Sequence, residues 1–333
     1  MTMHARALGL LFLLCAGVTI SLGLGRYPVG PHDLALALGL GTESDPDRLR
    51  LLRTLIVEVR LPRILAAICV GAALSVSGAA FQAMFINPLV SPGLLGVLAG
   101  ASLGAALGMV LSTHWIVIQI ATFACGLLAV GLAMLMARLY RGDRVLLLVL
   151  SGVVVSALFT ALLSIIKYLA DPYNQLPAIT YWLMGGFSLV SRESMTLMAP
   201  IMGLGVGLIL SLSGSLNALT MGDEEARTLG LRVARLRMVL ILAATLISSL
   251  TVVVGGIIGW VGLIIPHVGR MLVGPDNRIL LPVSALLGAL YLLVVDNLSR
   301  LIFPVEIPLG ILTSLLGIPV FALALRRSRG GWS

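Results

Sequence analysis

The stretch that decides the fold is residues 64–137, which read ILAAICVGAALSVSGAAFQAMFINPLVSPGLLGVLAGASLGAALGMVLSTHWIVIQIATFACGLLAVGLAMLMA. These 74 residues contain no Asp, Glu, Lys or Arg. A helix that crosses a membrane needs about 20 apolar residues, so the stretch holds three such helices with short connections. Turns are predicted where helix-breaking residues cluster, at NPLVSPG (87–93) and at STH (112–114).

The composition of the whole chain supports a membrane protein. Only 11% of its 333 residues are charged and 59% are hydrophobic, whereas soluble proteins have about 25% charged residues. A disordered chain would be rich in charge, and three cysteines are too few for a disulfide scaffold. We therefore predict an all-α polytopic membrane protein.

Further uncharged runs give the number of spans. They cover residues 7–25, 145–166, 194–222, 238–269, 279–295 and 307–325. The run 238–269 is too long for one crossing and is interrupted by Gly255, Gly256 and Gly259, so it predicts two spans and brings the total to ten. We expect one transmembrane domain over 1–333, with an external loop at about 26–60 and a cytoplasmic loop at about 214–235.

The first run could instead be a cleaved signal peptide. Its 19 residues exceed the usual apolar core of such a peptide, and no small-residue cleavage site follows it before Arg26. These observations favour a retained first helix.

The distribution of charge predicts the orientation. With ten spans and the N-terminus inside, the cytoplasmic segments carry 13 basic and five acidic residues, and the external segments carry nine of each. Positive residues gather on the cytoplasmic side of membrane proteins, so both termini are expected in the cytoplasm and the protein in the cell (inner) membrane. Because this asymmetry explains the net charge of +8, we expect a lipid bilayer around the chain and no nucleic-acid partner.

Small residues predict close helix packing, and no residue cluster predicts a metal site. Gly96, Gly100, Gly104 and Gly108 recur every four residues on one helix face, a pattern that lets a neighbouring backbone approach. The cysteines lie far apart in apolar runs and are expected to be structural.

The source of energy is indicated by what the sequence lacks. Lys167 is the only lysine, and no Gly-Lys-Ser/Thr phosphate loop surrounds it. Any energy that the protein uses must therefore come from an ion gradient or from a partner, and the absence of carboxylates from residues 64–137 favours a partner. A docking helix is predicted in LTMGDEEARTLGL (219–231), with Thr220 as N-cap and Gly230 as C-terminal stop. The alternative for this segment is a solvated loop helix.

Several motifs in this order resemble the FecCD-like permeases of iron-chelate and vitamin B12 ABC importers. They are RLPR (60–63), GAAL (71–74), NPL (87–89), PGLLGV (92–97), YWLMGG (181–186), GDEEARTLG (222–230), GLIIPH (262–267), PLG (308–310) and GIP (317–319). The resemblance covers nearly the whole chain, from about residue 60 to residue 327.

The resemblance implies a set of partners. Such permeases have ten helices, pair as homodimers or close heterodimers, and carry a metal chelate along the dimer interface. Two ABC ATPase subunits lie below, and a periplasmic or lipid-anchored substrate-binding protein lies above. ATP and Mg²⁺ would be bound by the ATPase, so no cofactor and no catalytic residue are expected in this chain.

The resemblance also implies site residues. Contact with the ATPase is expected for Gly222, Asp223, Glu224, Glu225, Ala226, Arg227, Leu229 and Gly230. The translocation path and its gates are expected at Gln82, Asn87, Pro88, Tyr181, Trp182 and Gly185. Docking of the binding protein is expected at Arg60, Arg63 and Arg300.

Alternatives remain for these assignments. Asn87 and Pro88 could simply form a turn between two spans. The three arginines could pair with local acids such as Glu58 and Asp296, or extend to lipid phosphates. Pro62 is expected in the first turn of the helix that carries Arg60 and Arg63. The expected cargo is a ferric siderophore or haem, with cobalamin as the alternative, and an ion-coupled secondary transporter is the alternative of another class.

Overall fold

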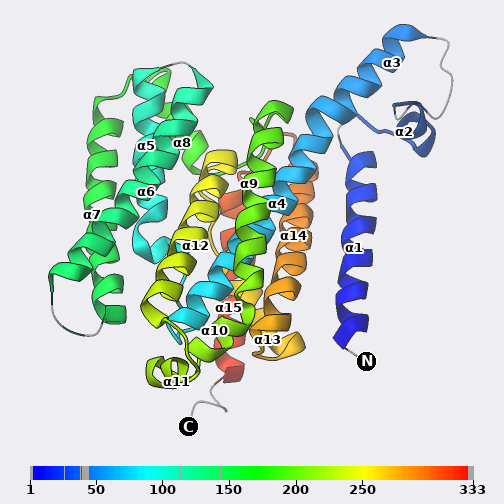
Figure 1. The fold of residues 1–333 in the computed structure, drawn as a ribbon. Coiled ribbons are helices and arrows are strands. Elements are labelled where there is room, and N and C mark those ends of the chain that lie inside the picture. Colours follow the sequence, from blue (N-terminus) through cyan, green and yellow to red (C-terminus); the bar gives the residue numbers. More distant parts are fainter. Residues whose placement is uncertain are drawn as a thin grey trace.

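The structure is a computed structural model that describes residues 3–25, 27–37, 39, 45–112, 114–140, 142 and 144–328. Throughout these residues every regular element is a helix, as the sequence predicts (Figure 1). In chain order the helices are α1 Met3–Gly23, α2 Pro31–Ala37, α3 Pro46–Arg53, η1 Thr54–Arg60, α4 Leu61–Met84, η2 Pro92–Leu95, α5 Val97–Leu111, α6 Trp115–Leu139, α7 Arg144–Leu169, α8 Gln175–Leu183, α9 Arg192–Ser211, α10 Ser213–Leu219, α11 Asp223–Thr228, α12 Val233–Gly255, α13 Val261–Val273, α14 Asn277–Leu301 and α15 Leu309–Ser328.

The number of apolar helices is roughly consistent with the ten predicted spans. Seven helical segments of the described chain are long and apolar enough to cross a membrane, and three shorter apolar helices lie at Val97–Leu111, Val261–Val273 and Leu309–Ala322. Together they account for the ten predicted spans. The glycine-interrupted run is divided as expected, since α12 ends at Gly255 and α13 begins at Val261.

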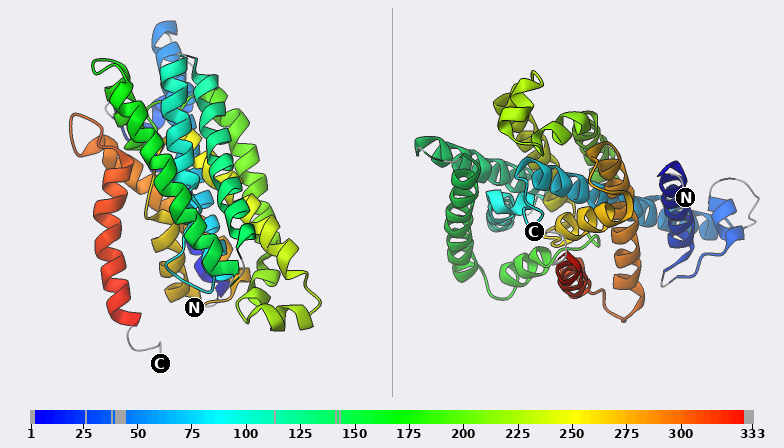
Figure 2. Two further views of the ribbon diagram at one scale, coloured as in Figure 1. Left: turned by 90° about the vertical axis from the view of Figure 1, so that its left-hand side faces the viewer. Right: turned by 90° about the horizontal axis from the view of Figure 1, so that it is seen from below.

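Helix α4 is the centre of the bundle and packs against α9, α12, α13 and α14 (Figures 1 and 2). Its glycines allow backbones to touch. A Cβ atom on Gly71 would lie 2.2 Å from the carbonyl oxygen of Gly288 in α14, and one on Gly78 would lie 1.9 Å from that of Gly262 in α13. Because no side chain fits at either position, small residues bring the two neighbouring helices directly onto α4.

Helices α5, α6 and α7 form a second group at one side of the bundle (Figure 1). A Cβ atom on Gly104 would lie 2.1 Å from the carbonyl oxygen of Ala121 in α6, and one on Gly100 would lie 2.4 Å from that of Cys125. The predicted close-packing face of α5 is therefore confirmed. Gly96 differs from the rest of the series, because it has φ +85° and forms the turn between η2 and α5.

The helix that contains Pro62 starts earlier than the sequence predicts. Residues 46–84 form one continuous helical segment made of α3, η1 and α4, where a loop was expected up to about residue 60. Element η1 is a π-helix, in which the Leu61 amide donates to the carbonyl of Ile56, five residues back. A proline ring clashes with the preceding turn of an ordinary α-helix, and the wider π turn accommodates Pro62 inside this longer helix.

Candidate functional site

The predicted cytoplasmic loop at about 214–235, which we call the coupling segment, contains two short helices, α10 and α11. They lie below α12 at one end of the bundle (Figure 1). The predicted N-cap at Thr220 is wrong, because the Thr220 hydroxyl donates to the Asn217 carbonyl at the end of α10. Gly222 is the N-cap of α11, with φ +119°, a conformation that favours glycine. The predicted stop at Gly230 is confirmed: it has φ +82°, and its amide donates to the Arg227 carbonyl.

The two sides of α11 differ in exposure. Ala226 is completely buried and fixes the helix against the bundle. Met221 and Leu229 flank α11 and are 64% and 63% exposed. The acidic side chains fall in the first turn, where the helix dipole favours them; they are Asp223, Glu224 and Glu225. The segment thus has a buried anchor and an outer surface that carries both charge and apolar side chains.

A residue that the sequence did not single out ties α11 to the core. Arg237 of α12 forms an ion pair with Asp223 at 2.7 Å, and its guanidinium also donates to the carbonyl oxygen of Met84, at 3.3 Å. Met84 is the last residue of α4. One side chain therefore joins the start of α11 to the end of the central helix. The sequence shows a group of arginines at the start of α12, which could have drawn attention to Arg237. Its partner Asp223 lies 14 residues upstream, and whether the two meet depends on how the loop folds.

A second contact holds the coupling segment to α14. The Asn217 amide group donates to Asp276 at 2.6 Å, and the backbone amide of Asn277 donates to the Asn217 side chain at 2.8 Å. Asp276 is the N-cap of α14 and also accepts from the Arg278 amide. The hydrogen bond from Asn217, followed by that from the Arg278 amide, lowers the pKa of the Asp276 carboxyl below its ordinary value.

The residues expected at one gate lie at the end of α4 and in the following turn. Gln82 is buried and donates to the carbonyl oxygens of Gly262 and Leu263 in α13, at 3.3 and 3.4 Å. Asn87 is exposed, and its side-chain oxygen accepts from the Leu89 amide at 2.9 Å across Pro88. Gln82 thus joins two helices, and Asn87 forms the turn that was the alternative for NPL. Their role in a translocation path stays a prediction.

The residues expected at the other gate form a junction of three helices. Tyr181 and Trp182 lie in α8, the predicted short helix, where Tyr181 is 44% exposed and Trp182 is buried. Gly185 follows the helix with φ +75°, and its carbonyl accepts from the Leu309 amide at the start of α15. The neighbouring Gly186 amide donates to the Gly255 carbonyl at the end of α12. This part of the chain is therefore fixed to the break between α12 and α13 and to the last helix.

Of the three arginines expected to dock a binding protein, Arg60 and Arg63 are buried and Arg300 is partly buried. They lie where η1 joins α4 and at the end of α14, at the end of the bundle opposite α11 (Figure 1). Arg63 bonds both oxygens of Asp296, at 2.9 and 3.1 Å, and reaches Glu306 at 3.0 Å. Arg300 contacts Asp296 at 3.3 Å.

Arg60 takes a different set of partners. Its guanidinium donates to the carbonyl oxygens of Leu22 and Tyr27. Glu58 pairs with Arg192 at 2.8 Å. Arg63 and Arg300 thus pair locally with Asp296, which was the alternative that the sequence left open. Docking of a binding protein by these arginines stays a prediction.

Comparisons with known proteins agree with this architecture. Residues 13–327 match the FecCD transport family. The molybdate import system permease protein MolB of Haemophilus influenzae is 39% identical over 97% of this chain and 96% of its own length. A probable iron chelatin transport system permease protein of Helicobacter pylori is 41% identical over 85% of this chain and 86% of its own length.

A solved structure has the same fold. It is described as a metal-chelate type ABC transporter in an inward-facing conformation, is 38% identical to this chain, and superposes with a TM-score of 0.86 over 97% of this chain and 99% of that one. The ion-coupled carrier left open by the sequence is not supported by these relatives. The chain belongs to the FecCD transport family and is a non-enzymatic permease subunit of an ABC importer, which works with a separate ATPase and a binding protein.

Proposed function

We propose that the cargo of this permease is a ferric siderophore or haem. The proposal rests on the resemblance of its motifs to permeases of that kind and on the iron chelatin relative in Helicobacter pylori. Cobalamin is the alternative chelate. Molybdate is a second candidate, because the molybdate permease of Haemophilus influenzae is similar along nearly the whole chain.

We further propose that two copies of the chain assemble as a homodimer in the cell (inner) membrane, with both termini in the cytoplasm. Exposed apolar side chains on a membrane helix are covered either by lipid or by a partner, and we assign helices α7 and α15 to the second copy. Each carries large apolar side chains that are exposed in the single chain, among them Leu150, Val154, Leu158, Ile311 and Leu315.

We also propose that the ATPase acts on the permease through α11, and the observation that carries this proposal is the chain of contacts from α11 to the end of α4. An ATPase that moves α11 would displace Asp223, and Arg237 would carry that displacement to Met84. The turn that begins at residue 85 and contains Asn87 follows directly. A movement of the ATPase would thereby be transmitted to the proposed gate at Asn87 through these few contacts, without a rearrangement of the whole bundle.

Reconstitution tests both the function and the cargo. The permease, its ATPase and its binding protein are placed together in vesicles, and uptake of a ferric siderophore, haem, cobalamin and molybdate is measured with and without ATP. ATP-dependent uptake of a ferric siderophore or haem is the expected result. ATP-dependent uptake of cobalamin or molybdate alone would replace the proposed cargo, and uptake by the permease alone under an ion gradient would contradict an ABC mechanism.

A pair of variants tests the coupling segment. Leu229→Asp places a charge on the exposed outer surface beside α11, and it is expected to weaken ATPase binding while the permease still inserts and folds. Arg232→Gln is the matched control, since Arg232 is also exposed and lies two residues after Gly230. Equal ATPase binding by both variants would show that α11 does not lie in the interface with the ATPase.

A further inference from the structure

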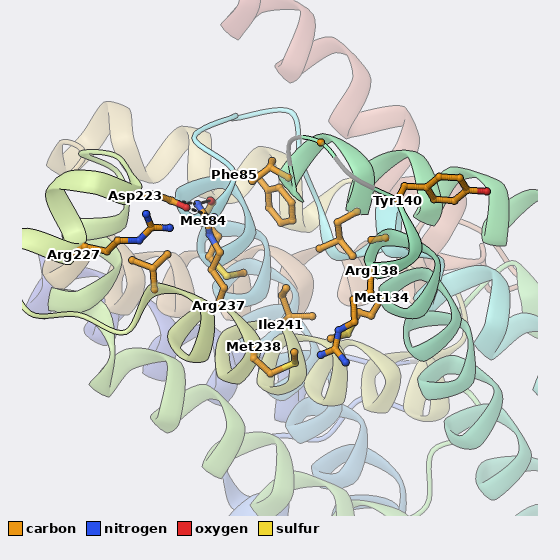
Figure 3. A pocket seen from close by; sticks show the side chains of 16 residues that line it. Met84, Phe85, Met134, Arg138, Tyr140, Asp223, Arg227, Arg237, Met238 and Ile241 are labelled. Atoms are coloured by element: carbon orange, nitrogen blue, oxygen red, sulfur yellow. Dashed lines mark hydrogen bonds and ion pairs between the residues drawn. The ribbon is translucent and has the colours of Figure 1, made fainter.

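A pocket of about 820 Å³ opens between the C-terminal ends of α4 and α6 and the N-terminal end of α12, beside α11 (Figure 3). This volume is within the range of small-molecule sites, about 300–1,000 Å³. The pocket lies among the helix ends that the charge distribution assigns to the cytoplasmic side. A lipid of the cytoplasmic leaflet would meet this pocket at the level of its headgroup.

The charged side chains around the pocket are mostly basic. Arg227 and Arg237 lie on one wall and Arg138 lies on the other (Figure 3). Asp223, paired with Arg237, is the one carboxylate among the lining residues that the structure describes. Within the described residues, no ion pair occupies the guanidinium group of Arg138 or Arg227. The Nε atom of Arg237 is buried and has no hydrogen-bond partner in the described chain. The pocket therefore has an excess of positive charge and a donor that a bound anion would satisfy.

The rest of the lining is apolar. It includes Met84, Phe85, Met134, Leu148, Met238 and Ile241. The same two helices, α6 and α12, also carry exposed large apolar side chains outside the pocket, namely Leu135, Leu139, Val239 and Leu242. Tyr140 lines the mouth and is 63% exposed, in keeping with the preference of tyrosine for the boundary between membrane and water. A soluble anion would use only the arginines, whereas a molecule with both a phosphate and hydrocarbon chains would use the whole lining.

We propose that this pocket binds an acidic phospholipid of the cytoplasmic leaflet, with its phosphate among Arg138, Arg227 and Arg237 and its acyl chains along the methionine-rich wall. The lipid would connect α6 with α11 and α12, so its occupancy would favour one position of the coupling segment. An effect of the lipid on ATP hydrolysis rests on the proposed function of α11, and the choice of leaflet rests on the proposed orientation, but binding of an acidic phospholipid rests on neither.

The test compares two arginines that differ in their relation to the pocket. Purified permease without its ATPase is stripped of lipid and titrated with phosphatidylglycerol or phosphatidylcholine, and bound lipid is counted by native mass spectrometry. Arg138→Gln is the test variant, because the side chain is exposed and no ion pair to another described residue would be broken. Arg235→Gln is the matched control, since Arg235 is equally basic and exposed on α12 but does not line the pocket.

We expect Arg138→Gln to weaken phosphatidylglycerol binding about five-fold, the effect of one basic residue near an anionic headgroup, and Arg235→Gln to leave it unchanged. Arg138→Gln combined with Arg227→Gln should weaken it about 25-fold. Equal binding by the test and control variants would overturn the proposal. So would equal binding of phosphatidylcholine, which would indicate simple filling by hydrocarbon, or full competition by glycerol phosphate, which would indicate a site for soluble anions.

The effect on ATP hydrolysis is measured separately in the complex with the ATPase. Loss of phosphatidylglycerol stimulation in Arg138→Gln, with lipid binding also reduced, is the expected result. Reduced lipid binding without a change in hydrolysis would refute the connection to α11 while leaving the binding site supported.

Discussion

Removal of Arg63 tests whether the buried ion network is a structural element. The perturbation is Arg63→Met, which keeps most of the aliphatic stem and removes both hydrogen bonds to Asp296, a side chain with no exposed surface. Stranding one partner of a buried ion pair costs about 3–5 kcal/mol. Because Arg300 still contacts Asp296 at 3.3 Å, we expect the lower end of that range, about 3 kcal/mol.

The matched control is Arg192→Met. Arg192 and Glu58 also join distant parts of the chain, at 2.8 Å, but their side chains are 58% and 48% exposed. Water screens such a pair, and its loss is expected to cost less than about 1 kcal/mol. The comparison therefore separates the effect of burial from the loss of an arginine.

Thermal unfolding of the purified permease in detergent measures both variants. At roughly 2–4 °C per kcal/mol, Arg63→Met should lower the Tm by about 6–12 °C and Arg192→Met by less than about 4 °C. Adding Asp296→Asn to Arg63→Met removes the stranded charge and should recover part of the loss. Equal, small shifts for Arg63→Met and Arg192→Met would refute the reasoning. Slower docking of the binding protein with an unchanged Tm would instead assign Arg63 to the docking surface.

Three further predictions follow from local geometry. Gly104→Ala forces a Cβ atom to 2.1 Å from a carbonyl oxygen of α6 and should cost about 1–3 kcal/mol of stability in detergent. A Cβ atom on Gly131 meets nothing within 4 Å, so the control Gly131→Ala should add about 0.5–1 kcal/mol. A loss of stability in both variants would contradict the packing argument. The lowered pKa of Asp276 means that its ionised form stabilises the fold, so this contribution is present above the ordinary pKa of 3.8 and is lost as the pH falls further. The Tm should therefore fall between pH 5 and 3 more in the wild type than in Asp276→Asn. Parallel curves of Tm against pH for the two proteins would rule this out. Ala226→Glu buries a charge under α11 and should abolish ATPase pull-down while the permease remains in the membrane, and intact pull-down would show that α11 does not need this anchor.

Some predictions from the sequence succeeded because they depend on local patterns. The ten spans follow from the length of apolar runs and from glycines that interrupt them. The stop at Gly230 follows from the backbone freedom of glycine. Neither depends on which helices become neighbours.

The candidate sites were predicted less completely, because their partners are distant in the chain. The motif residue Arg63 was visible in the sequence, but its partners Asp296 and Glu306 lie more than 230 residues away. Arg237 was not recognised at all, since its significance lies in reaching both Asp223 and Met84. The N-cap of α11 was misplaced by two residues, because Thr220 and Gly222 are both acceptable capping residues and the path of the loop selects one.

By itself, then, the sequence determined that this chain is a bundle of about ten membrane helices with a capped polar helix in one loop. Hydrophobic length, charge and the conformational range of single residues are properties of a short segment, and they act before any helix finds its neighbours. Only the tertiary structure decided that Arg63 and Arg300 both pair with the buried Asp296, that α11 is tied to the end of α4, and that three arginines line one pocket. Those features depend on which side chains from different helices meet, and in this chain close approach at small residues decides which helices pack together.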